Sequence, residues 1–188
     1  MTGRRAQIAE AGIRLLATRG VRALTHRAID EDLGLAPGST SYYARTRHDL
    51  ITLIVEHLSR RAFDDLATQQ FPHPLTPQTA AAAVVAALDA TMARADDHRA
   101  RLILLLECRG DPELQAALAT RPRVRENFVA AAAAMLRRLG ATRAEADAHD
   151  LAGLLDALLM QRIIRTAAFD EREVIAAYLT GLPKNTRG

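Results

Sequence analysis

The sequence is poor in cysteine and aromatic residues, and each scarcity excludes a class of structure. Cys108 is the only cysteine among 188 residues, so neither an intrachain disulfide nor a cysteine-based metal cluster can form. Tryptophan is absent and aromatic residues make up 4% of the chain, whereas alanine and leucine are abundant. Because alanine and leucine favour helices and β-branched runs are scarce, an all-α fold is expected.

Long hydrophobic runs and catalytic motifs are also missing. No apolar run approaches the roughly 20 residues of a membrane span, and the N-terminus leads into amphipathic sequence without a signal-type stretch, which predicts a cytoplasmic protein. There is no glycine-rich phosphate loop, nucleophile elbow or HExxH pattern. His26 and Asp30 have a spacing that could hold a metal, but no third ligand is evident nearby. The chain is therefore not expected to be an enzyme or to hold a cofactor or metal.

Positive charge is concentrated at the N-terminal end. The formal net charge is +3, and residues 1–50 contain eight arginines against five acidic residues, so the rest of the chain balances to zero. Local positive charge is typical of a phosphate-binding module, although a solvated basic face has the same composition.

Helical periodicity divides the first 70 residues into four segments. The predicted helices are 5–18, 27–33, 37–43 and 47–69. Gly20 follows the first, Thr25 is a candidate N-cap for the second, and Pro37 suits the first turn of the third. The third is short and rich in hydroxyl residues, so it would be a poor helix by itself. Two short helices joined by a glycine-containing turn, the second one polar, form a helix-turn-helix pattern. The alternative for this segment is a surface loop rich in serine and threonine.

Three prolines between positions 71 and 77 mark a loop and a boundary between two parts of the chain. The C-terminal part is predicted to contain helices at 77–95, 98–109, 112–120, 122–139, 143–168 and 171–181. The domain prediction is therefore a DNA-binding domain at 1–50, a connecting helix at about 47–69, and a helical domain at 71–188.

The first 50 residues resemble the DNA-binding domain of the TetR family of transcriptional regulators, and the order and spacing of the family pattern hold over about 26 of them. The family pattern of glycine, Thr-x-Arg, isoleucine, glycine, Gly-x-x-x-Tyr-Tyr, a basic pair and Asp-Leu is matched without a gap. The residues that match are Gly20, Thr25-His26-Arg27, Ile29, Gly34-Leu35-Ala36, Gly38-Ser39-Thr40-Ser41-Tyr42-Tyr43, Arg45-Thr46-Arg47 and Asp49-Leu50. Two positions depart from the pattern: Ala44 stands where the family usually has phenylalanine, and Asp30 where it usually has a small residue.

Each departure leads to an expectation. Loss of the ring at Ala44 should loosen the domain by a few kcal/mol unless Leu16, Leu50 or Ile54 fills the space. Asp30 is expected to form a local ion pair that holds Arg27 in one rotamer.

The resemblance implies a DNA-contacting role for a defined set of residues. Arg27 occupies a position from which a base edge can be reached, Thr25 caps the second helix near the DNA backbone, and Thr40 and Tyr42 lie at the boundary between groove and packing. The full predicted set is Arg4, Arg5, Thr25, His26, Arg27, Pro37, Gly38, Ser39, Thr40, Ser41, Tyr42, Tyr43, Arg45 and Arg47. For each of these, a plain surface side chain is the alternative.

The resemblance further implies that the C-terminal part forms a homodimer and binds a small-molecule effector. Residues 150–166 are apolar around most of the helix, which requires cover on more than one side, and the segment 124–136 is rich in alanine. The predicted dimer interface comprises Phe128, Ala132, Met135, Leu151, Leu155, Leu158, Leu159 and Arg162, with core helices of one subunit as the alternative. The candidate ligand residues are Met92, Cys108, Phe128, Met135, His149, Asp156 and Met160, and Asp156 is expected to be a buried carboxylate.

The sequence thus predicts a regulator, most simply a repressor that binds a palindromic operator as a dimer and is released by an effector. An activator or dual regulator of the same fold, and a helical interaction module without DNA binding, are the alternatives.

Overall fold

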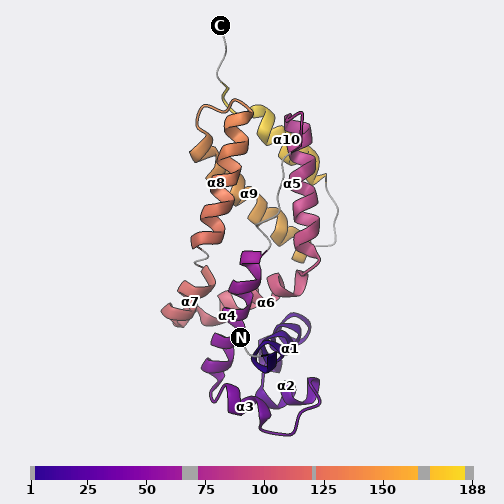
Figure 1. Ribbon diagram of the computed structural model, residues 1–188, viewed down its shortest axis with the longest axis vertical. Coiled ribbons are helices and arrows are strands. Elements are labelled where there is room, and N and C mark those ends of the chain that lie inside the picture. The colour runs from indigo at the N-terminus through magenta and orange to yellow at the C-terminus, as the bar shows by residue number, and fades with distance from the viewer. Residues whose placement is uncertain (1–2, 65–71, 120–121, 165–169, 185–188) are drawn as a thin grey trace. The chain divides into compact units, whose positions relative to one another are not determined.

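The computed structural model describes residues 3–64, 72–119, 122–164 and 170–184, and within these ranges the chain is helical. The α-helices are α1 (Gly3–Arg19), α2 (His26–Asp32), α3 (Ser39–Tyr43), α4 (Arg47–Asp64), α5 (Pro77–Met92), α6 (Ala95–Glu107), α7 (Pro112–Ala119), α8 (Pro122–Arg138), α9 (Ala144–Ile164) and α10 (Glu171–Gly181) (Figure 1). The all-α prediction is confirmed, and each predicted helix is present. The predicted ends of the helices after residues 64, 119 and 164 lie outside the described residues.

The helices pack as two units, each with its own core. The first unit contains α1–α4 together with α6 and α7, and the second contains α5, α8, α9 and α10. The domain boundary expected near residue 70 separates α4 from α5, but α6 and α7 pack with the N-terminal helices. Apolar side chains of α6 and α7, among them Leu104, Leu114 and Leu118, are buried in the same cluster as those of α1 and α4.

The first unit is built around α1, whose buried face includes the predicted stripe of Ile8, Ala11, Gly12, Leu15 and Leu16. This face packs against α4 and α6. The Thr25 hydroxyl accepts a hydrogen bond from the amide of Ala28, so Thr25 caps α2 as predicted.

The second unit pairs α8 with α9 and α5 with α10. Arg162 on α9 bonds to Glu171 on α10 and to Asp89 on α5, with an Nη1–Oδ1 distance of 2.7 Å to Asp89. The Tyr178 hydroxyl donates to the carbonyl of Asp147 at 2.8 Å, which ties α10 to α9. Among the described residues, no helix is both long and apolar enough to cross a membrane.

Two local details differ from the sequence-based expectations. The chain forms short 3-10 turns at Val21–Ala23 and Cys108–Gly110, which the helical periodicity did not indicate. The third helix begins at Ser39 instead of Pro37, because Gly38 stands before it with φ 90° in the left-handed region. A residue with a side chain rarely adopts that conformation, so glycine is required at this turn.

Gly12 of α1 lies close to α4. A Cβ at this position would lie 2.5 Å from Ile54 Cδ1 and 3.0 Å from Ile54 Cγ1. Overpacking costs about 1–3 kcal/mol, and alanine recovers about 1 kcal/mol of helix propensity. We therefore expect Gly12→Ala to lower the free energy of unfolding by about 1 kcal/mol in urea titrations.

Ile54→Val provides the control for that clash. By itself it should cost about 1 kcal/mol through the lost methyl group. Combined with Gly12→Ala, it should cost clearly less than the sum of the two single changes, because the missing methyl is the atom that the new Cβ meets. Strictly additive losses would show that the two helices do not meet at this point.

Candidate nucleic-acid interface

The position of α3 depends on the carboxylate of Asp30, which lies on α2 and is only 3% exposed. One oxygen accepts from the amide of Gly38 at 2.8 Å, and the other accepts from the amide and the hydroxyl of Thr40 at 2.8 and 2.6 Å. Since the first amides of a helix have no partner within it, a carboxylate placed there satisfies them and complements the helix dipole. Asp30 therefore acts as the cap of α3 from the neighbouring helix.

The charge of Asp30 is stabilised in this position. Burial raises the pKa of its carboxyl, but the hydrogen bonds from Thr40 and Gly38 and the nearby His26 outweigh burial, so the net pKa is lowered. The expected ion pair between Asp30 and Arg27 is wrong. Arg27 Nε instead lies 2.8 Å from Glu31 Oε1, one turn along the exposed face of α2. Asp30 faces inward, toward the amides of α3, so its oxygens are already occupied.

The departure at Ala44 is accommodated by the core. Ala44 is buried in the same cluster as Leu16, Leu50 and Ile54, each of which is fully buried. The packing is thus consistent with the expectation that these side chains fill the space of the missing phenylalanine ring. In addition, His26 Nε2 lies 2.7 Å from the Ala44 carbonyl oxygen and joins the start of α2 to the end of α3. His26 was predicted to contact phosphate, and in the structure its ring bridges the two helices.

Two arginines of the predicted set bond to main-chain carbonyls. Arg47 donates to the carbonyls of Leu24 and Val21 at 2.8 and 3.2 Å, and its Nη2 lies 3.8 Å from Glu107 of α6. Arg5 on α1 donates to the carbonyl of Tyr43 at 3.5 Å. Arg47 thus bonds to the segment before α2, and Arg5 bonds to the end of α3.

The exposed face of α2 and α3 carries hydroxyl, aromatic and cationic groups. Tyr42 is 82% exposed and packs edge-on against Tyr43, with ring centroids 5.1 Å apart, while Tyr43 is half-buried against the core. Arg27 and Arg45 are exposed. The phenol of Tyr42 on α3, the guanidinium of Arg27 on α2 and that of Arg45, two residues after α3, are donors that phosphates and base edges accept.

The remaining members of the predicted set fall into two groups. Thr40 was expected at the boundary between the groove and the protein interior. In the structure it is fully buried and its hydroxyl donates to Asp30, so it packs inside the protein. Ser39 is half-buried and donates its hydroxyl to the Ala36 carbonyl at 2.6 Å. The other residues of the set, Arg4, Thr25, Pro37, Gly38 and Ser41, are exposed or half-buried.

The predicted dimer residues are mostly part of the core of their own subunit. Ala132, Met135, Leu151, Leu155 and Leu158 are buried within the second unit. A side chain already buried in its own subunit cannot supply new buried area to a partner, so the burial of these residues agrees with the alternative of core helices within one subunit. Phe128 and Leu159 are half-buried against the same core, and Arg162 is engaged by Glu171 and Asp89.

The candidate ligand residues are divided between the two packing units. Cys108 is buried in the first unit, where burial and the nearby Asp111 and Glu107 raise the pKa of its thiol. The others belong to the second unit, in which Met135 is enclosed by the core, while His149 and Met160 are exposed and Phe128 and Met92 are half-buried. The expectation of a buried Asp156 is wrong, since its side chain is exposed and lies 2.7 Å from Arg125 of α8.

Comparisons with known proteins place this architecture in a family. The model of the family described as "Tetracyclin repressor-like, C-terminal domain" matches residues 75–184, more than half of the chain. A search of curated proteins finds no significant match. An N-terminal helix-turn-helix followed by helices that match this family model defines an all-α transcriptional regulator. The chain belongs to the TetR family.

Solved structures share the fold. A transcriptional regulator from Rhodococcus sp. Rha1 superposes with a TM-score of 0.71 at 17% identity, covering 95% of each chain. A TetR-family member from Streptomyces coelicolor A3 gives 0.65 at 21% identity, covering 96% of this chain and 99% of that one. The multidrug binding protein EbrR, complexed with malachite green, gives 0.64 at 22% identity with the same coverage.

The role of Asp30 as a cap is the feature that sequence reasoning missed. The signal was present, because an inward-facing aspartate on α2 precedes a helix that begins with glycine, serine and threonine and lacks an acidic cap of its own. What the spacing did not reveal was that the Gly38 and Thr40 amides lie closer to the carboxylate than Arg27 does.

Removing the Asp30 carboxylate should uncouple α3 from the rest of the unit. Asp30→Ala leaves two amides and one hydroxyl without an acceptor, and we expect a loss of about 2–4 kcal/mol in the free energy of unfolding. Glu31→Ala removes an exposed carboxylate one residue away and should change stability by less than about 0.5 kcal/mol. Equal effects in urea titrations would argue against the capping role.

The same contact predicts a pH dependence. Because folding lowers the pKa of Asp30, its carboxylate stabilises the fold above its ordinary pKa, and that contribution is lost as the pH falls through the lowered value. The stability difference between wild type and Asp30→Asn should therefore shrink in acid. A difference that stays constant from neutral to acidic pH would contradict the assignment.

Proposed function

We propose that the protein is a DNA-binding regulator that reads its operator with α3 and the start of α2. The observation that carries this proposal is the capping of α3 by Asp30. A five-residue helix is too short to be stable in isolation, and here a buried carboxylate holds it while the Tyr42 and Arg27 side chains remain exposed. In helix-turn-helix proteins the second helix enters the major groove.

The proposed contacts divide by chemistry. Arg27 is assigned to a base edge, where a guanidinium can bond to two acceptors of guanine. Tyr42, Tyr43, Ser39, Ser41 and Arg45 are assigned to phosphates or to the groove boundary, and Arg4 and Arg5 to additional phosphate charge. His26, Thr40 and Arg47 are assigned mainly to positioning, because their polar groups bond within the protein.

We further propose that the protein acts as a homodimer through the exposed faces of α8 and α9. On α9, an exposed stripe runs through Ala146, Gly153, Ala157, Met160 and Ile164, the last of which is 66% exposed. On α8, Ala130 and Ala134 are exposed. Small residues permit close approach of helices, and a two-fold interface would use the same faces of both copies. One short reading helix contacts few base pairs, so a palindrome read by two is the expected target.

The proposed regulatory mode is repression relieved by a small-molecule effector. EbrR, which has the same fold, is described as a multidrug binding protein and was solved with malachite green and with ethidium. In this mode, effector binding favours a state in which α4 has shifted and the two reading helices no longer match the groove spacing; only a difference in effector affinity between the two states can drive the change. An activator built on the same fold is the second candidate.

The reading role of Arg27 can be tested by fluorescence anisotropy with the DNA upstream of the protein's own coding region. Arg27→Ala should weaken binding by about 1–3 kcal/mol and relax the preference at one base position. Its matched control is Glu31→Gln, which releases Arg27 from its ion pair and should not weaken binding. Binding that is equal to random DNA, with Arg27→Ala unaffected, would rule out the proposed reading helices.

The dimer can be tested by sedimentation. Ala157→Glu places a charge in the exposed stripe of α9 and should convert a dimeric wild type to monomer, because an unpaired charge buried at an interface costs several kcal/mol. Ala177→Glu, at an exposed position of α10, is the control and should leave the dimer intact. A monomeric wild type, or a dimer that survives Ala157→Glu, would contradict this interface.

A further inference from the structure

The side chain of His57 lies on the inner face of α4 and is buried within the first unit. The residue is 8% exposed, and its Nε2 atom has no hydrogen-bond partner among the residues that the structure describes. Oε1 of Glu10 on α1 lies 3.6 Å from Nε2, which is beyond hydrogen-bond distance. Buried polar atoms are nearly always hydrogen-bonded, so this ring nitrogen calls for an explanation.

Two carboxylates act on the ring, one from α1 and one from α6. Asp97 of α6 is paired with Arg61 of α4, with 3.2 Å between Oδ2 and Nε, so its charge is already compensated. Glu10 of α1 lies beside the ring, but its side chain is 47% exposed, and water therefore screens its charge. A positive charge on the ring would gain little from either group.

Positive charges act on the same position. Arg60 and Arg61 follow His57 within one turn of α4, and both disfavour a further positive charge on the ring. Arg94, which precedes α6, donates to the carbonyl of Arg61 at 3.3 and 3.4 Å. His57 is thus a buried weak base beside two guanidinium groups of its own helix.

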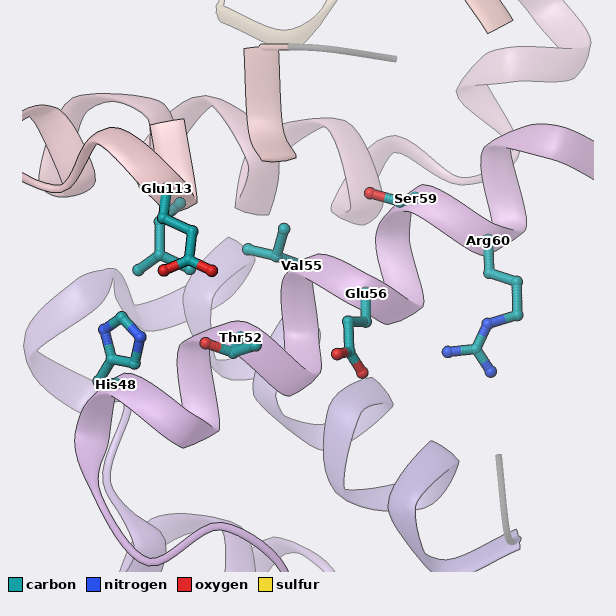
Figure 2. Close-up of a pocket in the computed structure, with 8 residues that line it drawn as sticks. His48, Thr52, Val55, Glu56, Ser59, Arg60 and Glu113 are labelled. Atoms are coloured by element: carbon teal, nitrogen blue, oxygen red, sulfur yellow. The ribbon is translucent and has the colours of Figure 1, made fainter. Parts of the chain in front are cut away.

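The other charges along α4 lie on different faces of the helix. Figure 2 shows Glu56 and Arg60, four residues apart, extending to one side of α4. Both are exposed, whereas His57 is buried, so the ring points to another face. α7 also packs on α4, and its one charged residue, Glu113, extends toward the end of α4 that carries His48 (Figure 2). The carboxylates that support a charge on the ring are therefore the two from α1 and α6.

The uncharged ring is the form that suits this packing. Burial lowers the pKa of His57, Glu10 raises it, and Arg61 and Arg60 lower it again, with a lowered pKa as the result. The contribution of the neutral ring to stability is present above the ordinary pKa of histidine, about 6.5. It is lost as the pH falls from that value through the lowered one, because the unfolded chain then binds the proton more readily.

From this cluster of charges we infer that His57 is a proton-sensitive latch between α1 and α4. The uncharged ring stays buried at the junction, and α1 stays closed on α4. When the ring takes up a proton, both of its nitrogens become donors, and the added charge has no adequate partner in the closed arrangement. The protonated ring therefore favours a state in which the contact at Glu10 is open and the ring reaches water.

Mild acid thus loosens the unit that contains α2 and α3, because Ile29 of α2 and Ala44 at the end of α3 are buried in the same core as α1 and α4. This inference goes beyond the proposed function and does not rest on it, since proton uptake and helix opening are measured without DNA.

The first measurement is a titration of the histidine ring resonances of the full-length protein by nuclear magnetic resonance, with His57 assigned through the backbone. We expect its midpoint below about 6.5, the ordinary value of the ring. Glu10→Gln should lower this midpoint further, because it removes the carboxylate beside the ring, and Arg60→Gln should raise it. A purely structural ring would not respond to these two exposed positions in opposite directions.

The second measurement is hydrogen exchange of the amides of α1 between pH 7.5 and pH 5, corrected for the intrinsic rate. If opening takes up one proton, its equilibrium constant should rise by up to about tenfold for each pH unit below the ordinary pKa. His57→Gln should abolish this rise. The other histidines of the unit are present in both proteins, so their contributions cancel, and Asp30 stays ionised in this range because its pKa is lowered.

His73→Gln is the matched control, since His73 is an exposed histidine of the second unit, and it should leave the acid response of α1 unchanged. A His57 midpoint at or above about 6.5 would overturn the inference. So would a midpoint that neither Glu10→Gln nor Arg60→Gln moves, or an acid response of α1 that persists in His57→Gln. If His57→Gln does not fold, the titrations of wild type, Glu10→Gln and Arg60→Gln decide by themselves, because they keep the ring in place.

Discussion

The contact between the Asp30 carboxylate and the start of α3 is the constraint on which the proposed DNA-binding surface depends. A helix of five residues gains too little from its own hydrogen bonds to persist, and its first amides need an acceptor. Asp30 supplies two oxygens from a buried position, and the three hydrogen bonds it receives keep its charge favourable there. His26 bonds to the carbonyl of Ala44 after α3, and Arg47 bonds to the carbonyl of Leu24 before α2. The exposure of Tyr42 follows from this arrangement, because α3 is held entirely from its inner side.

A second constraint is that α6 and α7 belong to the same packing unit as α2 and α3. The chain leaves this unit after α4, forms α5, and returns with α6, so a core that begins with α1 is completed by residues about a hundred positions later. Contacts such as Arg47 with Glu107 and His48 with Asp111 join the first turn of α4 to the segment between α6 and α7. These contacts connect the end of α6 and the start of α7 directly to the first turn of α4.

Most of the fold could be predicted from the sequence because its signals are local. Thr25, Pro77 and Pro112 mark helix starts through their own side chains, and the stripe around Leu15 and Leu16 follows from helical spacing. The failures occurred where a residue had two available partners. The spacing of Asp30 permitted a bond to Arg27, but the amides of α3 are closer in the fold. Leu151, Leu155 and Leu158 lie on a helix that is apolar nearly all round, so periodicity could not say which face meets its own subunit.

In α3, the residues that attach the helix to the domain differ from the residues that it exposes. Thr40 and Gly38 are committed to Asp30, whereas Ser41 and Tyr42 take no part in that attachment. Exchanges at the latter positions would leave the orientation of the helix intact while altering the chemistry it presents. If α3 contacts DNA as proposed, its recognition sequence could change during evolution through single replacements that each leave the protein folded. For the same reason, these positions of α3 are suitable for engineering regulators with new target sequences.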